Sequence, residues 1–423
     1  MRENRLNNTH IAWNLVLIYL ILVFIGWLNI YSASKTETHY HLLDFSSKYG
    51  KQLLWIGFSF VSGFLILFID TKIFKQFAAF FYLFSLLSLI GLFLFGKTIN
   101  GATSWYSIGS FTLQPTEFTK IAVALGIAKL LGDKQFDLRL FSNQLKALIV
   151  LIIPSILIIL QPDPGSALVY LSFVFVFYRE GLPRLYIVTS LTLLITALLV
   201  IKFGFIFVDI LALIFFLFFL FYIYKNKNHI FRKNILLYIS AFLGFALLIF
   251  AIGFTFKKLP QRHIDRINLA LHIVEDTRGK GYNIEQSKIA IGSGGFFGKG
   301  FLQGTQTKGD FVPEQHTDFI FSTVGEEWGF IGSSFVILLF IAFILLIIRM
   351  SEQQKTKFSR VYGYSIAAIF FFHFTINIGM AIGILPTIGI PLPFFSYGGS
   401  SILAFSILLF IFIALDSNKV NEW

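Results

Sequence analysis

Ionisable side chains interrupt the apolar segments of this sequence at positions where they could do chemistry. Glu117 and Lys120 are three residues apart, so in a helix they share a face and can form an ion pair. Asp163 lies between two apolar segments. A charge at membrane depth costs roughly 2.5–3.5 kcal/mol, so such residues usually have a function. The pair either anchors a helix end or lines a polar cavity, and Asp163 either caps the next helix or lines the same cavity.

A second group of candidates lies in the polar stretch 257–318. Asp276 precedes a Gly-Lys-Gly-Tyr sequence, and His316 and Asp318 come near the end of the stretch. Carboxylates and imidazoles are the usual general acids and bases of enzymes. These residues either form a solvated surface or make a poorly solvated reactive site, because an apolar segment begins directly after them at Phe319.

Familiar cofactor signatures are missing from the sequence. The residues around His316 do not match the HExxH zinc pattern, and a loosely held divalent cation (Mg²⁺ or Mn²⁺) is the one cofactor left open. No GxxxxGK[ST] loop, no GxGxxG after a strand and no D-x-D pair occurs, which argues against ATP-driven transport and dinucleotide chemistry. Without cysteine there is no disulfide and no thiolate nucleophile.

The composition indicates the elements that must position these residues. Hydrophobic residues make up 56% of the 423 residues and charged residues only 13%, whereas a soluble domain has about 25% charged residues. Runs such as 206–224 and 235–256 are long enough to cross a hydrocarbon core of about 30 Å, and in lipid they must be helical. The predicted class is an all-α, polytopic integral membrane protein.

Twelve membrane spans are predicted. Their approximate bounds are 11–31, 52–69, 76–96, 116–132, 145–161, 165–178, 185–203, 205–224, 235–256, 319–349, 361–385 and 396–416. An even number places both termini on one side, and Lys- and Arg-rich loops at 70–75, 179–184, 225–234 and 350–360 predict that this side is the cytoplasm. The large loop 257–318 then lies outside, and the first segment is an uncleaved span rather than a signal peptide.

The outward loop is predicted to have structure of its own. Apolar residues at helical spacing predict an interfacial amphipathic helix at 262–274, with Arg262 and Arg266 between them. Eight glycines fall within 279–304, which suggests tight turns and close approach to something bulky or phosphorylated. A helical stretch that contains Lys288 interrupts them.

The net charge of +12 has a simple explanation in this class of protein. Lysine and arginine cluster in short loops, where they act as orientation signals and contact lipid headgroups. No basic face runs along a soluble helix, so membrane lipids are expected as partners and nucleic acid is not.

Five sequence blocks resemble the SEDS family (shape, elongation, division and sporulation). The match covers nearly the whole chain outside about 190–240. The first block is Gly101 through Trp105 with Ile108-Gly109 and Gln114 through Glu117, and the second is Gln161-Pro162-Asp163-x-Gly165. The third is Gly281-Tyr282 with Gln286 through Gly295. The fourth is Pro313 through Phe321 with Gly325 through Glu327, and the fifth is Pro391 through Phe394 with Ser396 through Ser401. Gln315 is typical of the RodA-like branch of the family, whereas the FtsW-like branch usually has alanine there.

This resemblance implies a peptidoglycan glycosyltransferase of the bacterial inner membrane that polymerises lipid II during cell-wall elongation. It also implies that the chain works with a class B penicillin-binding transpeptidase and other elongasome proteins. The family's essential aspartate precedes the G-x-G-Y motif and maps onto Asp276. The match carries over Glu117 and Lys120 as cavity residues.

The implied reaction joins C1 of a MurNAc on undecaprenyl diphosphate to the 4-hydroxyl of an acceptor GlcNAc. The hydroxyl needs a base, for which Asp276 is the candidate, and the leaving diphosphate needs cations. The candidate cations are Lys120, Arg262, Arg266 and Lys288. Glu117, Asp163, His316 and Asp318 complete the predicted substrate-binding set.

Three features depart from the family pattern. Ser104 stands where many relatives have arginine, and Thr277 replaces a usual proline after Asp276. Three spans between 185 and 256 stand where the family has one, so we expect a single domain with a core of ten spans and an inserted pair at about 190–240. Alternative functions are a lipid II flippase that uses the same cavity, a non-catalytic scaffold, and an FtsW-like septal glycosyltransferase.

Overall fold

Ten helices of the computed structural model are long and apolar enough to cross a membrane. The structure describes residues 11–35, 44–99, 101–109, 111–225, 235–258, 261, 264, 268 and 281–419. Within these residues the ten helices are α1 (Trp13–Ser34), α2 (Lys48–Phe68), α4 (Ala78–Phe95), α6 (Phe141–Leu160), α9 (Arg184–Phe203), α10 (Phe205–Lys225), α12 (Ile235–Lys258), α16 (Ile320–Glu352), α17 (Lys357–Ala381) and α18 (Gly399–Ser417). The protein is therefore a polytopic helical membrane protein, as the composition predicts.

The two other predicted spans, 116–132 and 165–178, are helical but shorter. The first is α5 (Pro115–Leu131), which begins with a proline. Proline lacks a backbone N–H, and it is tolerated at the first helical position because an N–H there makes no hydrogen bond within the helix. The second is broken into α7 (Pro164–Leu168), the 3₁₀ helix η2 (Val169–Ser172) and α8 (Phe173–Arg179). All twelve predicted segments are thus helical, but only ten meet the length and composition expected of a span.

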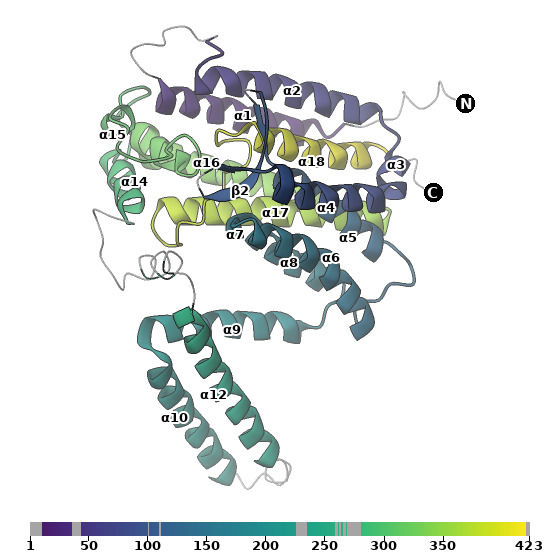
Figure 1. The fold of residues 1–423 in the computed structure, drawn as a ribbon, viewed down its shortest axis with the longest axis vertical. Helices are drawn as coiled ribbons and strands as arrows, with labels where there is room; N and C mark the ends of the chain where they lie inside the picture. The colour runs from purple at the N-terminus through teal and green to yellow at the C-terminus, as the bar shows by residue number, and fades with distance from the viewer. Residues whose placement is uncertain are drawn as a thin grey trace. The chain divides into compact units, whose positions relative to one another are not determined.

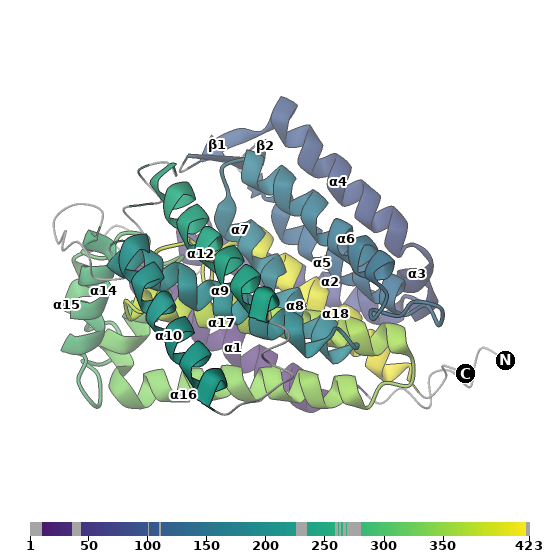
Figure 2. The ribbon, with the colours of Figure 1, turned by 90° about the horizontal axis from the view of Figure 1, so that it is seen from below.

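A small antiparallel sheet corrects the all-α expectation in one detail. Strands β1 (Lys97–Ile99), β2 (Ala102–Ile108) and β3 (Phe111–Leu113) pair in the order β1-β2-β3. The Tyr106 hydroxyl donates to the Ser88 carbonyl of α4 at 2.8 Å, which ties the sheet to that helix. Figure 2 shows the sheet at the end of α4 farthest from α3 (Thr71–Gln76).

The larger of two compact units contains the predicted site residues that the structure describes. It comprises the described parts of 1–182 and 283–423. Helix α18 packs against α2, α5 and α17, while α17 also packs against α5 and α16. Figure 1 shows α18, in yellow, between α2 and α17. These inner helices are buried by their neighbours, so polar residues on them face protein rather than lipid.

The second unit, 183–282, is built from α9, α10 and α12. Gly204 adopts φ 84° between α9 and α10, where the sequence predicts a break, and this left-handed conformation favours glycine. Phe216 and Phe242 stack with ring centroids 4.4 Å apart, joining α10 to α12. Three helices thus occupy the region where the family pattern has one, and the inserted pair at about 190–240 stays a prediction.

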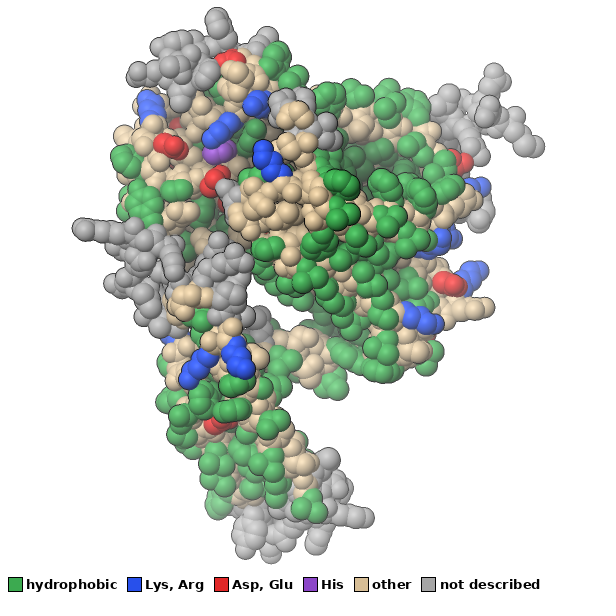
Figure 3. Space-filling model, viewed as in Figure 1, with side chains coloured by type: hydrophobic (Ala, Val, Ile, Leu, Met, Phe, Trp, Pro, Cys, Tyr) green, Lys and Arg blue, Asp and Glu red, His purple; other side chains and the backbone are tan. Residues whose placement is uncertain are grey.

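Charged side chains are concentrated at the helix ends. Figure 3 shows hydrophobic side chains covering the helix faces of the larger unit, with most visible charges toward the two ends. Two further helices, α14 (Tyr282–Ser293) and α15 (Thr305–Lys308), lie in the segment before α16. The helical stretch predicted around Lys288 is confirmed by α14, whereas the predicted helix at 262–274 falls almost wholly outside the described residues.

Candidate functional site

A buried ion pair lies in the first turns of α5, where that helix meets α17. The Lys120 Nζ atom is 2.8 Å from Glu117 Oε1 and 3.0 Å from His373 Nε2. All three side chains are at most 3% exposed. The structure therefore confirms the pairing expected from the three-residue spacing, and such burial argues against an anchor at a solvated helix end.

An aromatic ring covers the same group. Phe405 of α18 places its ring centroid 5.0 Å from Lys120 Nζ, at cation–π distance. The His373 ring meets Phe405 edge-on at 4.9 Å between centroids. Three helices therefore enclose the ammonium group. In such surroundings, removing one partner of the ion pair would leave an uncompensated buried charge, which costs about 3–5 kcal/mol.

Several polar atoms near the ion pair have no hydrogen-bond partner among the described residues. They are Glu117 Oε2, the Thr116 hydroxyl and the Tyr170 hydroxyl. Tyr170 is buried and lies within electrostatic range of both Glu117 and Asp163. Buried polar atoms are normally satisfied, so these atoms keep capacity for a bound polar group beside the ion pair.

Asp163 caps the N-terminus of α7. Its Oδ1 accepts from the Ser166 backbone N–H at 3.2 Å, and its Oδ2 accepts from the Ser166 hydroxyl at 2.8 Å. The Gln114 side-chain amide also donates to Oδ2 at 3.2 Å. Of the two sequence-based alternatives, the cap is thus formed, and it links the start of α5 to the start of α7.

The predicted residues His316 and Asp318 lie in a short segment that is held by its backbone. The carbonyls of 316–318 accept one hydrogen bond each, from the Tyr397 backbone N–H at 2.8 Å, the Ser396 hydroxyl at 2.6 Å and the Asn377 side-chain amide at 2.8 Å. Two family-like blocks far apart in the sequence therefore meet here. The His316 ring packs beside the Tyr397 ring, with centroids 5.7 Å apart.

The His316 imidazole is partly buried beside charged groups. Burial lowers its pKa to about 4, and the nearby Lys48 ammonium contributes in the same direction. Lys48 Nζ is 3.5 Å from His316 Nδ1, while Glu314 Oε2 is 3.9 Å from Nε2. At neutral pH this ring is therefore uncharged and can act as a hydrogen-bond acceptor or donor, but not as a cation.

Lys288 is the most exposed of the described candidate cations. On α14 it forms an ion pair with Glu285 at 3.1 Å, and its side chain is 41% exposed. Its aliphatic part lies against the turn at Gly383, where an added Cβ would come within 3.0 Å of Lys288 Cδ. The ammonium group is thus accessible to an anionic substrate at the surface.

Glu326 has a structural environment that sequence reasoning missed. Its carboxylate, which is fully buried, accepts from the Lys299 ammonium at 2.7 Å and from the backbone N–H groups of Gln306 and Thr307 at 2.8 Å each. The Thr307 hydroxyl donates to it at 2.7 Å. The carboxylate therefore holds the segment 299–307 against the first turns of α16.

The structure separates the predicted site residues into three groups. Glu117 and Lys120 form the buried group, Asp163 caps α7, and Lys288 on α14 belongs with His316 and Asp318 to the segment before α16. Asp276, Arg262 and Arg266 lie outside the described residues. His373 was missed, although a single histidine within a predicted span is the same kind of signal that singled out Glu117.

Among the described residues, no three His, Asp or Glu side chains are placed to hold a metal ion. Glu314, His316 and Asp318 are among the described residues and do not come together as such a group.

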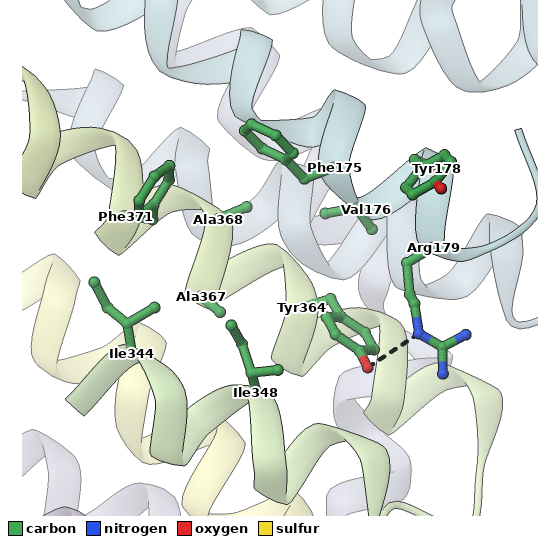
Figure 4. A pocket seen from close by; sticks show the side chains of 10 residues that line it. All are labelled: Phe175, Val176, Tyr178, Arg179, Ile344, Ile348, Tyr364, Ala367, Ala368 and Phe371. Atoms are coloured by element: carbon green, nitrogen blue, oxygen red, sulfur yellow. Dashed lines mark hydrogen bonds between the residues drawn. The ribbon is translucent and has the colours of Figure 1, made fainter. Parts of the chain in front are cut away.

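A cavity of about 410 Å³ is lined by none of the predicted site residues. Its walls come from α8, α16 and α17 and are almost wholly apolar, as Figure 4 shows. At its edge Arg179 donates to the Tyr364 hydroxyl and forms a forked ion pair with Glu352. The cavity is therefore an apolar groove between helices with charged side chains at one edge.

Comparison with known proteins places the chain among bacterial cell-wall proteins. The family model FtsW/RodA/SpoVE, described as a cell cycle protein, matches residues 12–209 and 209–421. Peptidoglycan glycosyltransferase RodA of Treponema pallidum is 33% identical, over 96% of this chain and 97% of that protein. Stage V sporulation protein E of Bacillus subtilis is 31% identical, over 97% of each.

Solved structures show the same fold. A chain from a peptidoglycan synthase complex that coordinates polymerization and crosslinking superposes with a TM-score of 0.68 at 24% identity, covering 97% of this chain and 99% of that one. The Thermus thermophilus rod shape determining protein RodA superposes with a TM-score of 0.62 at 22% identity, covering 97% and 98%.

Proposed function

The chain belongs to the FtsW/RodA/SpoVE family, and from this premise we propose that it is a peptidoglycan glycosyltransferase that polymerises lipid II during cell-wall elongation. The observation that carries the proposal is the end-to-end similarity to a peptidoglycan glycosyltransferase at 33% identity. The buried ion pair supports it, because a charged pair enclosed by three membrane helices costs free energy that a purely structural bundle would avoid.

In the proposed reaction the 4-hydroxyl of an acceptor GlcNAc attacks C1 of a MurNAc on undecaprenyl diphosphate. The bond from C1 to O4 forms as the bond from C1 to the diphosphate oxygen breaks. Asp276 takes the hydroxyl proton, which makes the oxygen a competent nucleophile. The electron pair of the broken bond leaves with the diphosphate, whose growing negative charge needs nearby cations.

The candidate cations differ in how they could act on the diphosphate. Lys288 is exposed on α14 and can meet the substrate directly. Lys120 is 2% exposed and is already bonded to Glu117 and His373. We therefore propose that Lys120 acts on the diphosphate through its electric field and without direct contact, while Arg262 and Arg266 remain candidate direct contacts.

A divalent cation does not enter the proposed steps. The described residues do not gather three ligands of the kind that Mg²⁺ or Mn²⁺ prefers. Such an ion, when bound, would supply positive charge to the leaving diphosphate.

The proposed location and partners of the chain follow from its family membership. The chain is a multi-pass membrane protein, and we propose that it resides in the bacterial inner membrane with both termini in the cytoplasm. One solved relative belongs to a complex that couples polymerization to crosslinking. We propose that this chain likewise works with a class B penicillin-binding transpeptidase and with other elongasome proteins.

Substitution of the candidate base tests the proposal. We expect Asp276→Asn to abolish polymerisation of purified lipid II, because the amide cannot accept the hydroxyl proton; loss of a general base lowers rates about 10²- to 10⁴-fold. Glycan chain length and rate are measured with the full chain and its cognate transpeptidase, after quantifying the protein in the membrane.

Asp137→Asn serves as the matched control. This carboxylate accepts from the Arg139 backbone N–H at 2.9 Å in an exposed turn, and an asparagine oxygen can replace that bond. It should polymerise lipid II like the wild type. Normal glycan synthesis by Asp276→Asn would contradict the assigned role, and a wild type without activity would contradict the proposed function.

A further inference from the structure

The two ring nitrogens of His373 each face a group whose hydrogen-bonding role is fixed. Nδ1 is 3.0 Å from the Pro391 carbonyl oxygen, which can only accept, so Nδ1 must carry the proton. Nε2 is 3.0 Å from the Lys120 ammonium, which can only donate, so Nε2 must be the acceptor. Both contacts require the neutral ring in a single tautomer.

This ring therefore completes the surroundings of the Lys120 ammonium. Glu117 supplies the opposite charge and Phe405 the ring face, while His373 supplies the second oriented acceptor. The His373 side chain is 1% exposed, so bulk water does not reach the ammonium from this side. An apolar side chain at this position would leave one ammonium N–H without an acceptor in a dry environment, which favours reorientation of Lys120.

The same face of α17 also holds the loop that follows it. Asn377 lies four residues after His373, so the two share a helix face. Asn377 donates to the Ile390 carbonyl at 2.8 Å, next to the Pro391 carbonyl that His373 binds. The second N–H of this amide reaches the Asp318 carbonyl at 2.8 Å. These hydrogen bonds, joined by the backbone of residues 390–391, connect the buried ion pair to the segment that carries His316 and Asp318.

We propose that His373 is a positioning residue for glycosyl transfer. It orients the Lys120 ammonium, and through the loop at 390–391 it fixes the position of the ion pair relative to the segment 316–318. This inference rests on the proposed function, because its effect is read out in polymerisation. His373 touches no reacting atom. Its contribution is to keep one charge in place while the diphosphate leaves.

Two substitutions with opposite expectations test the inference. His373→Phe keeps a planar ring but removes both hydrogen bonds, and we expect the kcat of lipid II polymerisation to fall about 10- to 100-fold with KM changed less than about threefold. His373→Gln can donate to Pro391 and accept from Lys120, so we expect it to keep kcat within about threefold of the wild type.

Tyr362→Phe is the matched control on the same helix. It removes one buried hydrogen bond, from the Tyr362 hydroxyl to the Leu408 carbonyl at 2.9 Å, away from the ion pair. If it lowers kcat as much as His373→Phe, a general packing defect of α17 explains both, and the inference is overturned. Wild-type kcat in His373→Phe, or a His373→Gln variant as defective as His373→Phe, would also overturn it.

The assay includes the wild type and Asp276→Asn so that the two proposals are judged separately. An active wild type and an inactive Asp276→Asn support the proposed function whatever the His373 variants do. A wild type without polymerisation overturns the proposed function and this inference with it. Thermal unfolding midpoints in detergent, measured for each variant, show whether a loss of kcat accompanies a loss of folding.

Discussion

At the scale of single residues, the same side-chain types serve different purposes according to their burial. Lys120 and Lys288 are both candidate cations with an i,i+3 glutamate partner, yet Lys120 is 2% exposed and Lys288 is 41% exposed. An exposed ion pair stabilises by about 0–1 kcal/mol, whereas breaking a buried pair costs about 3–5 kcal/mol. Spacing in the sequence predicts both pairs equally well, and burial alone distinguishes them.

The lowered pKa of His316 predicts a pH dependence. The unfolded chain binds a proton at the ordinary histidine pKa of 6.5 and the folded chain only near pH 4. The unfolded state therefore binds more protons between these values, and stability falls as pH falls from 6.5 to 4. The loss is at most about 3.5 kcal/mol, from about 1.4 kcal/mol per pKa unit.

Hydrogen exchange of the amides in 314–319, compared between pH 7 and pH 4.5, measures this loss. His316→Gln should remove the part of the pH dependence that the imidazole causes. Lys48→Met should weaken it, since the Lys48 ammonium contributes to the lowered pKa. An exchange profile that depends on pH equally in wild type and His316→Gln would show that other groups are responsible.

At the scale of elements, α16 is held differently at its two ends. Its first turns enclose Glu326, whose carboxylate is bound by the segment 299–307, and its chain direction changes at Gly329. Gly329 adopts φ 64°, and an added Cβ would lie 2.3 Å from the Gly298 backbone nitrogen. Its last turn carries Glu352 in a 46% exposed ion pair with Arg179.

These two glutamates predict different costs for the same substitution. Glu326→Gln replaces a carboxylate that satisfies several buried donors with a group that has one acceptor oxygen, so we expect a loss of about 3 kcal/mol and release of the segment 299–307. Glu352→Gln breaks only an exposed pair, with an expected loss of about 0–1 kcal/mol. Trypsin cleavage at Lys299 and Lys308 reports the release.

The control for this prediction is Glu352→Gln, at the other end of the same helix. Faster cleavage in Glu326→Gln but not in Glu352→Gln is the expected result. Equal cleavage of both variants and wild type would mean that the backbone contacts at Gly298 and Gly329 hold the segment without the carboxylate.

At the scale of the whole molecule, helix parity predicts which side of the membrane each loop faces. The predicted inward loop at 350–360 and the predicted outward segment at 299–318 lie at opposite ends of α16. Since the chain has no cysteine, a single introduced thiol reports its side without background.

Two exposed positions suit this measurement. We expect a membrane-impermeant maleimide to label Lys308→Cys in intact spheroplasts and to label Gln353→Cys only after the membrane is opened, because both side chains are exposed but face opposite sides. Labelling of Gln353→Cys in intact spheroplasts would reverse the proposed orientation and place the Asp276 loop inside.

The sequence by itself determined the class, the twelve helical segments and the Glu117–Lys120 pairing. These depend on local properties: apolar runs must be helical in lipid, and residues three apart share a helix face. The family-like blocks also singled out Asp276, which the described residues do not include. Of the smaller elements, the helix around Lys288 was predicted from the sequence, whereas the sheet at 97–113 was not, because β1 and β3 are only three residues long.

Only the tertiary structure decided what encloses the charges. His373 and Lys120 are in contact although 253 positions separate them in the chain. Glu326 likewise binds Lys299 and Thr307, which precede it by 27 and 19 positions. No local period encodes such contacts, because they depend on which helices pack together and in what register. Packing of α17 and α18 against α5 buries the Glu117–Lys120 pair, and this burial is what distinguishes it from the exposed Glu285–Lys288 pair.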